Sequence, residues 1–256
     1  MHHAQVDRLS CRHSPLHRLD SRTKLSGAII FTVFVISLPT TSVSVLACFA
    51  VGPFAALIIG KVPLKFVIKH ILIISPFVLL LALSSLFYDK TPVTTQFGPF
   101  NWTVSSGLIR FFSIYAKFIV TMAALISLVA TTRFNDLLAA MAKLGVPKIL
   151  VLQLGFLWRY IFMLTDKAAN VLRERAGRKL RYLGIKTELK TAAAMTGTLF
   201  ISSIDTAARV NTAMRGRGFT GRLHTISKMR FTKPDLIFAA AFCLYMAGLI
   251  FLMRVL

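Results

Sequence analysis

Long apolar runs separated by short polar segments fill the first half of the chain. Four runs cover residues 25–38, 43–60, 66–87 and 104–130. The first two are short for a hydrocarbon core of about 30 Å, so their flanking residues must contribute to a span. A fifth run, residues 236–252, follows only after a long basic stretch. This pattern predicts an all-α, polytopic membrane protein with about five transmembrane helices.

Turn-forming residues divide the runs. Residues 39–42 break the first run from the second, whereas Gly52-Pro53 lies inside the second run. We expect one kinked helix there, since neighbouring helices can satisfy the backbone groups that a proline frees. Residues 88–102 are polar and rich in turn formers, and Tyr88 and Trp102 flank them as interfacial aromatic residues would. We expect a loop between two membrane helices at this point.

Composition and charge support a membrane location. Hydrophobic residues make up 55% of the chain, yet its formal net charge is +22. These values conflict for a soluble domain, whereas a membrane protein separates apolar spans from basic cytoplasmic segments. A basic chain could instead bind nucleic acid, but a bilayer already accounts for charge that lies beside apolar runs. We therefore expect the lipid bilayer as a partner and no nucleic acid.

Lysine and arginine counts set the expected orientation. The tail before the first run carries five such residues and the loop at 88–102 only one, whereas residues 131–233 hold nineteen against five acids. Because basic loops stay inside, the N-terminus and the long basic region should be cytoplasmic. We therefore expect a multi-pass protein of the cell (inner) membrane. Its cytoplasmic tail would be residues 1–24, and its first four transmembrane helices residues 25–130. A cytoplasmic region, residues 131–233, and a last transmembrane helix, residues 234–256, would follow.

The basic region has the pattern of three helices. Thr132 suits the N-cap of the first helix, which Gly145 ends. The second would cover residues 147–182, with an apolar first half and a charged second half. The third, residues 188–215, is rich in small residues, which let two helices cross at close range.

The third helix ends in glycines that bracket arginine, which predicts an exposed, mobile basic tip. An ordinary helix C-cap with cations favoured by the helix dipole explains the same residues. The residues of this tip are Arg215, Gly216, Arg217 and Gly218.

The sequence shows no constellation for catalysis. Paired catalytic carboxylates, zinc-protease and phosphate-loop motifs and a nucleophile elbow are all missing. The three cysteines lie far apart, and we expect Cys48 and Cys243 to be small packing residues inside spans. Histidines near the N-terminus could form a metal-binding tail, although a solvated polar tail explains them as well. We expect a protein that is not an enzyme and has no metal site or cofactor.

One basic residue lies deep in the fourth run. Lys117 is costly in a span and should face other helices or a partner. A transport role and internal pairing or snorkelling both remain open for it.

Four stretches of the chain carry a family resemblance. They are His17-Arg18-Leu19-Asp20-Ser21-Arg22-Thr23-Lys24-Leu25, residues 130–134 with 144–147, Trp158-Arg159-Tyr160-Ile161-Phe162, and residues 207–219. Over nearly its whole length the chain resembles the transmembrane T component of energy-coupling factor (ECF) transporters, in the cobalt/nickel-type (CbiQ-like) branch.

The resemblance implies a scaffold with two crossed cytoplasmic coupling helices. In this family each helix ends in a short Ala-Arg-Gly-like motif that docks into a groove on one of two ATPase subunits. The same chain grips a membrane-embedded substrate-binding subunit, and ATP is bound by the partners alone. The implied role is coupling in an importer of cobalt or nickel.

The family motifs are carried over onto two sets of residues in this chain. The resemblance implies that Arg217 is the docking arginine of the second motif, in which Gly216 replaces alanine, a change between two small residues. The first motif has the family's composition in scrambled order, so either Arg175 or Arg178 is its docking arginine. The residues of the first motif are Arg175, Ala176, Gly177 and Arg178.

Other functions remain as alternatives. A vitamin importer would use a similar T component, because the substrate is held by another subunit. A self-contained secondary transporter would show internal repeats and polar residues at the bilayer midplane, and the sequence shows neither. A membrane-bound enzyme is disfavoured by the missing catalytic constellation.

Overall fold

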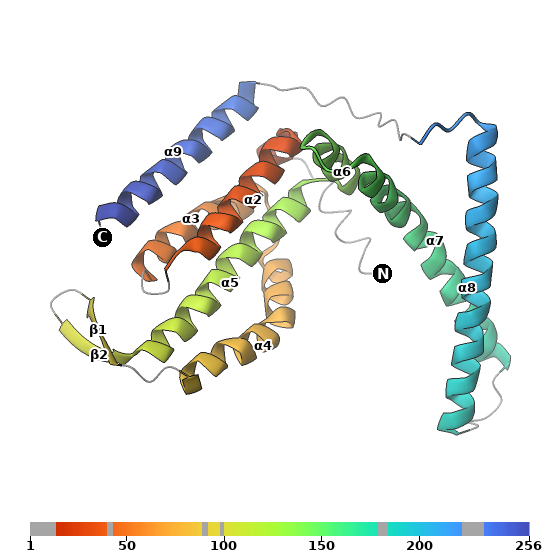
Figure 1. The fold of residues 1–256 in the computed structure, drawn as a ribbon, viewed down its shortest axis with the longest axis horizontal. Helices are drawn as coiled ribbons and strands as arrows, with labels where there is room; N and C mark the ends of the chain where they lie inside the picture. Colours follow the sequence, from red (N-terminus) through yellow and green to blue (C-terminus); the bar gives the residue numbers. More distant parts are fainter. Residues whose placement is uncertain are drawn as a thin grey trace. The chain divides into compact units, whose positions relative to one another are not determined.

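The computed structural model describes residues 14–39, 43–88, 92–97, 100–178, 184–221 and 233–255. Within these ranges eight α-helices, one 3₁₀ turn and one two-stranded hairpin are present (Figure 1). The all-helical fold class is thereby confirmed. In chain order the elements are η1 (Pro15–Arg18), α2 (Ser21–Ser37), α3 (Val43–Ile59), α4 (Leu64–Tyr88), β1 (Pro92–Phe97), β2 (Phe100–Ser105), α5 (Ser106–Thr131), α6 (Phe134–Lys143), α7 (Lys148–Arg178), α8 (Ile185–Gly216) and α9 (Lys233–Val255).

An antiparallel hairpin, β1–β2, takes the place of the expected loop between α4 and α5. Its register pairs Pro92 with Ser105 and Phe97 with Phe100. Val, Thr, Phe and Trp fill the two strands, and these residue types favour extended backbone. Polarity and turn formers alone predicted a loop, so the preference of these residue types for β-strands was missed.

Hydrogen bonds define two helix starts. The helix α2 begins at Ser21, where the Asp20 side chain accepts a hydrogen bond from the Arg22 amide at 3.0 Å. The predicted N-cap at Thr132 is wrong, because α6 begins at Phe134 and the Arg133 carbonyl accepts the first helical hydrogen bonds.

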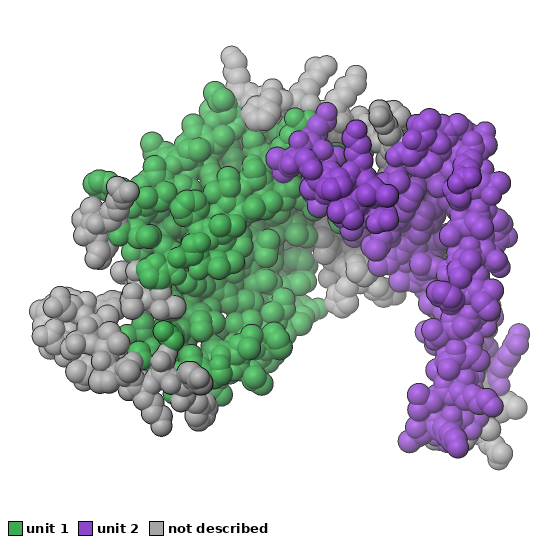
Figure 2. All heavy atoms as spheres, in the orientation of Figure 1, with its two compact units in different colours: residues 1–140, 227–256 green, residues 141–226 purple. Residues whose placement is uncertain are grey.

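The chain forms two compact units, coloured separately in Figure 2. Unit 1 comprises residues 1–140 and 227–256, and unit 2 comprises residues 141–226. Among the described helices, α4, α5, α7 and α9 are long and apolar enough to cross a membrane by length and composition. The helices α2 and α3 have 17 residues each, at the short end for a span, as their apolar runs predicted.

The helix α5 is the centre of unit 1. It packs against α2, α3 and α4, and α9 packs against α2 and α3. Polar bonds join α4 to α5: the hydroxyls of Ser75 and Tyr115 lie 3.0 Å apart, and Ser85 donates to the Gly107 carbonyl at 3.2 Å. Such bonds matter in lipid, where burial of apolar side chains provides little drive for helices to associate.

Two lysines join α2 and α5 reciprocally. Lys24 at the start of α2 donates to the carbonyl of Thr131, the last residue of α5, at 3.0 Å. Lys117 of α5 donates to the carbonyls of Ile36 and Leu38 at the end of α2, the first at 3.3 Å. Each lysine therefore reaches the C-terminal carbonyls of the other helix, where the helix dipole favours a cation.

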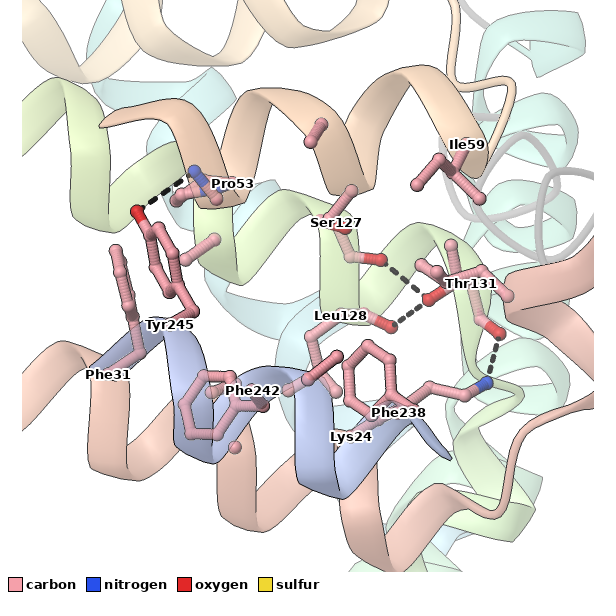
Figure 3. Close-up of a pocket in the computed structure, with 18 residues that line it drawn as sticks. Lys24, Phe31, Pro53, Ile59, Ser127, Leu128, Thr131, Phe238, Phe242 and Tyr245 are labelled. Atoms are coloured by element: carbon pink, nitrogen blue, oxygen red, sulfur yellow. Dashed lines mark hydrogen bonds between the residues drawn. The ribbon is translucent and has the colours of Figure 1, made fainter. Parts of the chain in front are cut away.

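The Tyr245 hydroxyl of α9 lies where Pro53 interrupts the backbone hydrogen bonds of α3. The helix continues through Pro53, which has no amide hydrogen to donate to the Phe49 carbonyl. The Tyr245 hydroxyl lies 2.9 Å from the Cys48 carbonyl oxygen and 3.2 Å from that of Phe49. It also accepts a hydrogen bond from the Gly52 amide at 3.1 Å (Figure 3). One side chain thus satisfies backbone groups that the proline leaves free.

A side chain at position 52 should disrupt this contact. An added Cβ on Gly52 would lie 3.0 Å from the Tyr245 ring and 3.1 Å from its hydroxyl. We expect Gly52→Ala to destabilise the detergent-solubilised protein by about 1–3 kcal/mol, the usual cost of overpacking. The measurement is the temperature at which the protein stops eluting as a single species.

Gly248→Ala is the matched control, because nothing lies within 4 Å of its added Cβ. This change should leave the melting temperature equal or higher, since alanine is the better helix former. A loss equal to that of Gly52→Ala would contradict the role given to Tyr245.

Candidate functional site

The helices α7 and α8 form an antiparallel pair within unit 2. Near the connection, Arg175 forms an ion pair with Glu188 in the first turn of α8. Further along, the Lys167 ammonium donates to the Thr206 hydroxyl at 2.8 Å. Neither helix has a buried residue in the structure. Polar cross-links therefore join this pair in place of an apolar core.

Three of the small residues of α8 lie away from this contact, whereas the Ser202 hydroxyl accepts a hydrogen bond from Lys167 of α7 at 3.5 Å. Ala192, Ala193 and Gly197 are exposed, and nothing lies within 4 Å of a Cβ added to Gly197. The expected close crossing therefore does not involve Ala192, Ala193 or Gly197 between α7 and α8.

The end of α8 is a Schellman motif that presents Arg217. The Phe219 amide donates to the Met214 carbonyl, and the Gly218 amide donates to the Arg215 carbonyl, both at 3.0 Å. Gly218 adopts the left-handed φ of +77° that this motif requires. The Phe219 ring then packs 6.2 Å from that of Phe156 of α7.

Arg217, as the C-cap residue, is exposed together with the residues on either side of it. The sequence allowed two interpretations of this segment, an exposed tip or an ordinary helix C-cap. In the structure Arg217 is both, because it caps α8 and is exposed. The backbone of the tip is fixed by its hydrogen bonds, while its arginine remains available to a partner.

The first predicted motif forms the last turn of α7. Its two arginines differ: Arg175 is held in the ion pair with Glu188, whereas Arg178 is the final helical residue and is exposed. Ala176 and Gly177 between them are also exposed. The ion pair is partly buried, with side-chain exposures of 26% and 19%.

The two motifs lie at opposite ends of α8. The ion pair places the end of α7 beside the first turn of α8, and Arg217 caps its last turn. A helix of 32 residues is about 48 Å long at about 1.5 Å per residue. The structure therefore does not bring the two motifs together into one site.

Lys117 has internal partners, the carbonyls at the end of α2. This contact supports internal pairing and gives no support to a transport role. Cys48 and Cys243 are exposed rather than packed inside the protein, and the histidines at positions 2, 3 and 13 lie outside the described residues. Within the described residues no group of three or more His, Cys, Asp or Glu side chains could hold a metal ion.

Sequence reasoning missed a buried polar cluster in unit 1. Lys24 and Asp235 are buried, and Asp235 accepts a hydrogen bond from the Asp20 amide at 2.6 Å. The only signal in the sequence is a polar residue at each boundary of an apolar run, which does not reveal that these boundaries meet.

The two glycines of the second motif should respond differently to alanine. Gly218→Ala forces a side chain into the left-handed region, at a cost of about 1–2 kcal/mol, whereas a Cβ on helical Gly216 meets nothing within 4 Å. We expect faster amide hydrogen exchange in residues 214–221 of Gly218→Ala and unchanged or slower exchange in Gly216→Ala. Equal exchange in both variants would contradict the motif.

Comparison with known proteins identifies relatives over most of the chain. The family described as "CbiQ: Cobalt transport protein" matches residues 12–227. The energy-coupling factor transporter transmembrane protein EcfT of Bacillus selenitireducens is 28% identical over 218 residues, covering 81% of each chain. The EcfT protein of Bacillus subtilis is 26% identical over 220 residues, covering 81% of this chain and 82% of its own.

A third relative has a different length. A putative ABC transporter ATP-binding protein of Bifidobacterium longum is 26% identical over 253 residues, which are 93% of this chain but 32% of that protein.

These matches settle the class of protein. Members of the matched family are non-catalytic transmembrane subunits, so the prediction that this chain is a multi-pass membrane protein and not an enzyme is confirmed. The resemblance first noted in four stretches extends across residues 12–227. The chain belongs to the CbiQ family of cobalt transport proteins, the transmembrane T components of energy-coupling factor transporters.

Proposed function

We propose that this chain is the scaffold through which two ATPase subunits drive a membrane-embedded substrate-binding subunit, for the uptake of cobalt or nickel. The proposal rests on two exposed arginines: Arg178, at the end of α7 beside the first turn of α8, and Arg217, at the other end of α8. The metal rests on the family's description as a cobalt transport protein. A T component of a vitamin importer is the alternative, and the identity of the co-purifying substrate-binding subunit distinguishes the two.

Two features support ATPase partners. A separation of about 48 Å between the ends of α8 suits two separate subunits better than one groove. In the relative from Bifidobacterium longum, the matching segment belongs to a longer protein named for ATP binding. A segment like this chain therefore occurs in one polypeptide with such a protein.

The structure favours Arg178 as the docking arginine of the first motif. Arg175 already pairs with Glu188, whereas Arg178 is exposed at the C-terminus of its helix, much as Arg217 is at the end of α8. Arginine forms several charge-assisted hydrogen bonds to a carboxylate. We therefore assign docking to Arg178 and Arg217, and a bracing role to Arg175.

Membrane helices offer the remaining contact surface. Leu72, Phe77 and Leu80 of α4 and Leu244 of α9 are 68–79% exposed. In a multi-pass protein such side chains face lipid or another membrane subunit. We propose that they contact the bilayer and the substrate-binding subunit.

For orientation, we propose that the N-terminus and residues 131–233 are cytoplasmic. The charged end of α7, which includes Arg173 and Arg178, would lie outside if α7 crossed the membrane, against the rule that basic segments stay inside. We propose instead that α7 stays on the cytoplasmic side, with its apolar first half at the membrane surface. Arg178 and Arg217 then both remain accessible to ATPase subunits.

The orientation can be tested by labelling introduced cysteines after replacing Cys11, Cys48 and Cys243. We expect Gln96→Cys to react with an impermeant thiol reagent from outside and Lys186→Cys only after the membrane is opened. Labelling of both positions from the same side would overturn the topology.

The docking assignment is tested at Arg217. Loss of one partner from a buried charge pair in an interface costs about 2–5 kcal/mol. We expect Arg217→Glu to reduce ATPase co-purification and uptake together, and to do so more than Arg217→Ala, because it sets like charges against each other. Membrane insertion should not change.

Two comparisons make the docking test specific. Arg209→Glu, at an exposed position of the same helix outside the motif, controls for general loss of charge. Arg178→Glu should weaken the complex as Arg217→Glu does, and Arg175→Ala should do so less. Equal weakening by Arg209→Glu and Arg217→Glu would show that the attraction is diffuse.

A further inference from the structure

A buried polar cluster joins the helix ends of unit 1 on either side of the basic region. We call Asp20, Lys24, Thr131, Asp136 and Asp235 the Lys24 joint. Within it, Lys24 is only 7% exposed and Asp235 is fully buried. Three carboxylates, those of Asp136, Asp235 and Asp20, attract the Lys24 ammonium.

The hydrogen bonds of the joint connect three elements directly. Lys24 of α2 holds the last carbonyl of α5 at Thr131, at 3.0 Å. One turn earlier, the Asp20 amide donates to Asp235 in the first turn of α9 at 2.6 Å. Asp136 lies in the first turn of α6. The start of α2 is therefore linked to the end of α5 and to the starts of α6 and α9.

The position of the joint in the chain gives it a role beyond packing. The segment between Thr131 and Lys233 contains α6, α7 and α8, with both docking motifs. Its only covalent connections to the other helices are the end of α5 and the start of α9, and the joint holds both. A force applied at Arg178 or Arg217 that travels along this chain must reach α5 and α9 through these two connections.

A cavity adjoins the helix α9 near the joint. This cavity, of about 330 Å³, lies between α9 and the helices α2, α3 and α5, with Lys24 at one end (Figure 3). Phe238, Ala241 and Phe242 of α9 line it. Beyond this stretch of the helix, Phe242, Tyr245 and Met246 of α9 pack against the core of unit 1.

We propose that Lys24, with Asp235, is a positioning residue for energy coupling: it fixes the end of α5 and the start of α9 to one point, so that movement of the basic region turns both helices together. This inference rests on the proposed scaffold function. In this role the joint acts through the helices that it holds. Coupling energy that passes through packed polar contacts typically changes on mutation by a modest factor.

The test uses the complex of the full chain with its ATPase partners in lipid nanodiscs. Spin labels on Leu72→Cys of α4 and Leu244→Cys of α9, both exposed sites of unit 1, in the background without native cysteines, report the distance between the two helices. For the otherwise unchanged chain we expect ATP to shift the ratio of two distance populations. Lys24→Met should reduce this shift by about two- to thirtyfold, with ATPase co-purification unchanged.

Three further variants separate coupling from folding. Lys24→Arg should keep the ATP-driven shift. Asp235→Asn, which retains an acceptor for the Asp20 amide but removes the charge, should reduce it, and it carries the test if Lys24→Met fails to fold. Lys117→Met removes the same type of lysine–carbonyl bond away from the joint, so it should lower thermal stability and leave the shift intact.

Each result bears on one claim. An unreduced shift in both Lys24→Met and Asp235→Asn overturns the positioning role, as does an equal reduction in Lys117→Met. Co-purification of the ATPases without any ATP-driven shift in the unchanged chain also overturns it. Failure of the unchanged chain to bind ATPases would instead refute the proposed function.

Discussion

The reciprocal lysine bonds between α2 and α5 are the contact on which the rest of unit 1 depends. A helix of 17 residues barely spans the hydrocarbon core, so its final carbonyls end where water cannot reach them easily. Lys117 supplies donors at that end, and Lys24 does so for α5 at the other. Because both ends of α2 are fixed to α5, the remaining helices have a defined surface to pack on. Tyr245 then adds α9 by satisfying the backbone around Pro53.

Unit 2 follows a different principle. Its two long helices bury no residue and are joined by an ion pair, a lysine–threonine bond and one aromatic contact. A pair of helices without a core gains most of its stability from partners or lipid. This exposure suits the role proposed for the segment, in which other subunits hold it. The Schellman motif at Gly218 keeps its tip ordered even so, because backbone hydrogen bonds need no core.

Most helices could be predicted because a bilayer leaves the backbone few choices. An apolar run must form a helix there, so its length and its flanks predict the element. The predictions failed where a local signal was weak or read for the wrong property. The hairpin at 92–105 was hidden by its polarity, and the cap of α6 shifted by one residue to Arg133. Our proposal of Arg178 rather than Arg175 depended on Glu188, thirteen residues along the chain from Arg175.

By itself, the sequence determined the membrane class and most of the helices, because hydropathy and charge act locally along the chain. Only the tertiary structure decided which polar groups meet. Asp20 and Asp235 are 215 residues apart in the chain, and Lys24 and Thr131 are 107 apart. A buried polar group needs a partner, but neither its own residue type nor its neighbours in the sequence specify which one. That choice depends on how the helices pack, and here the packing gathers the ends of four helices around one lysine.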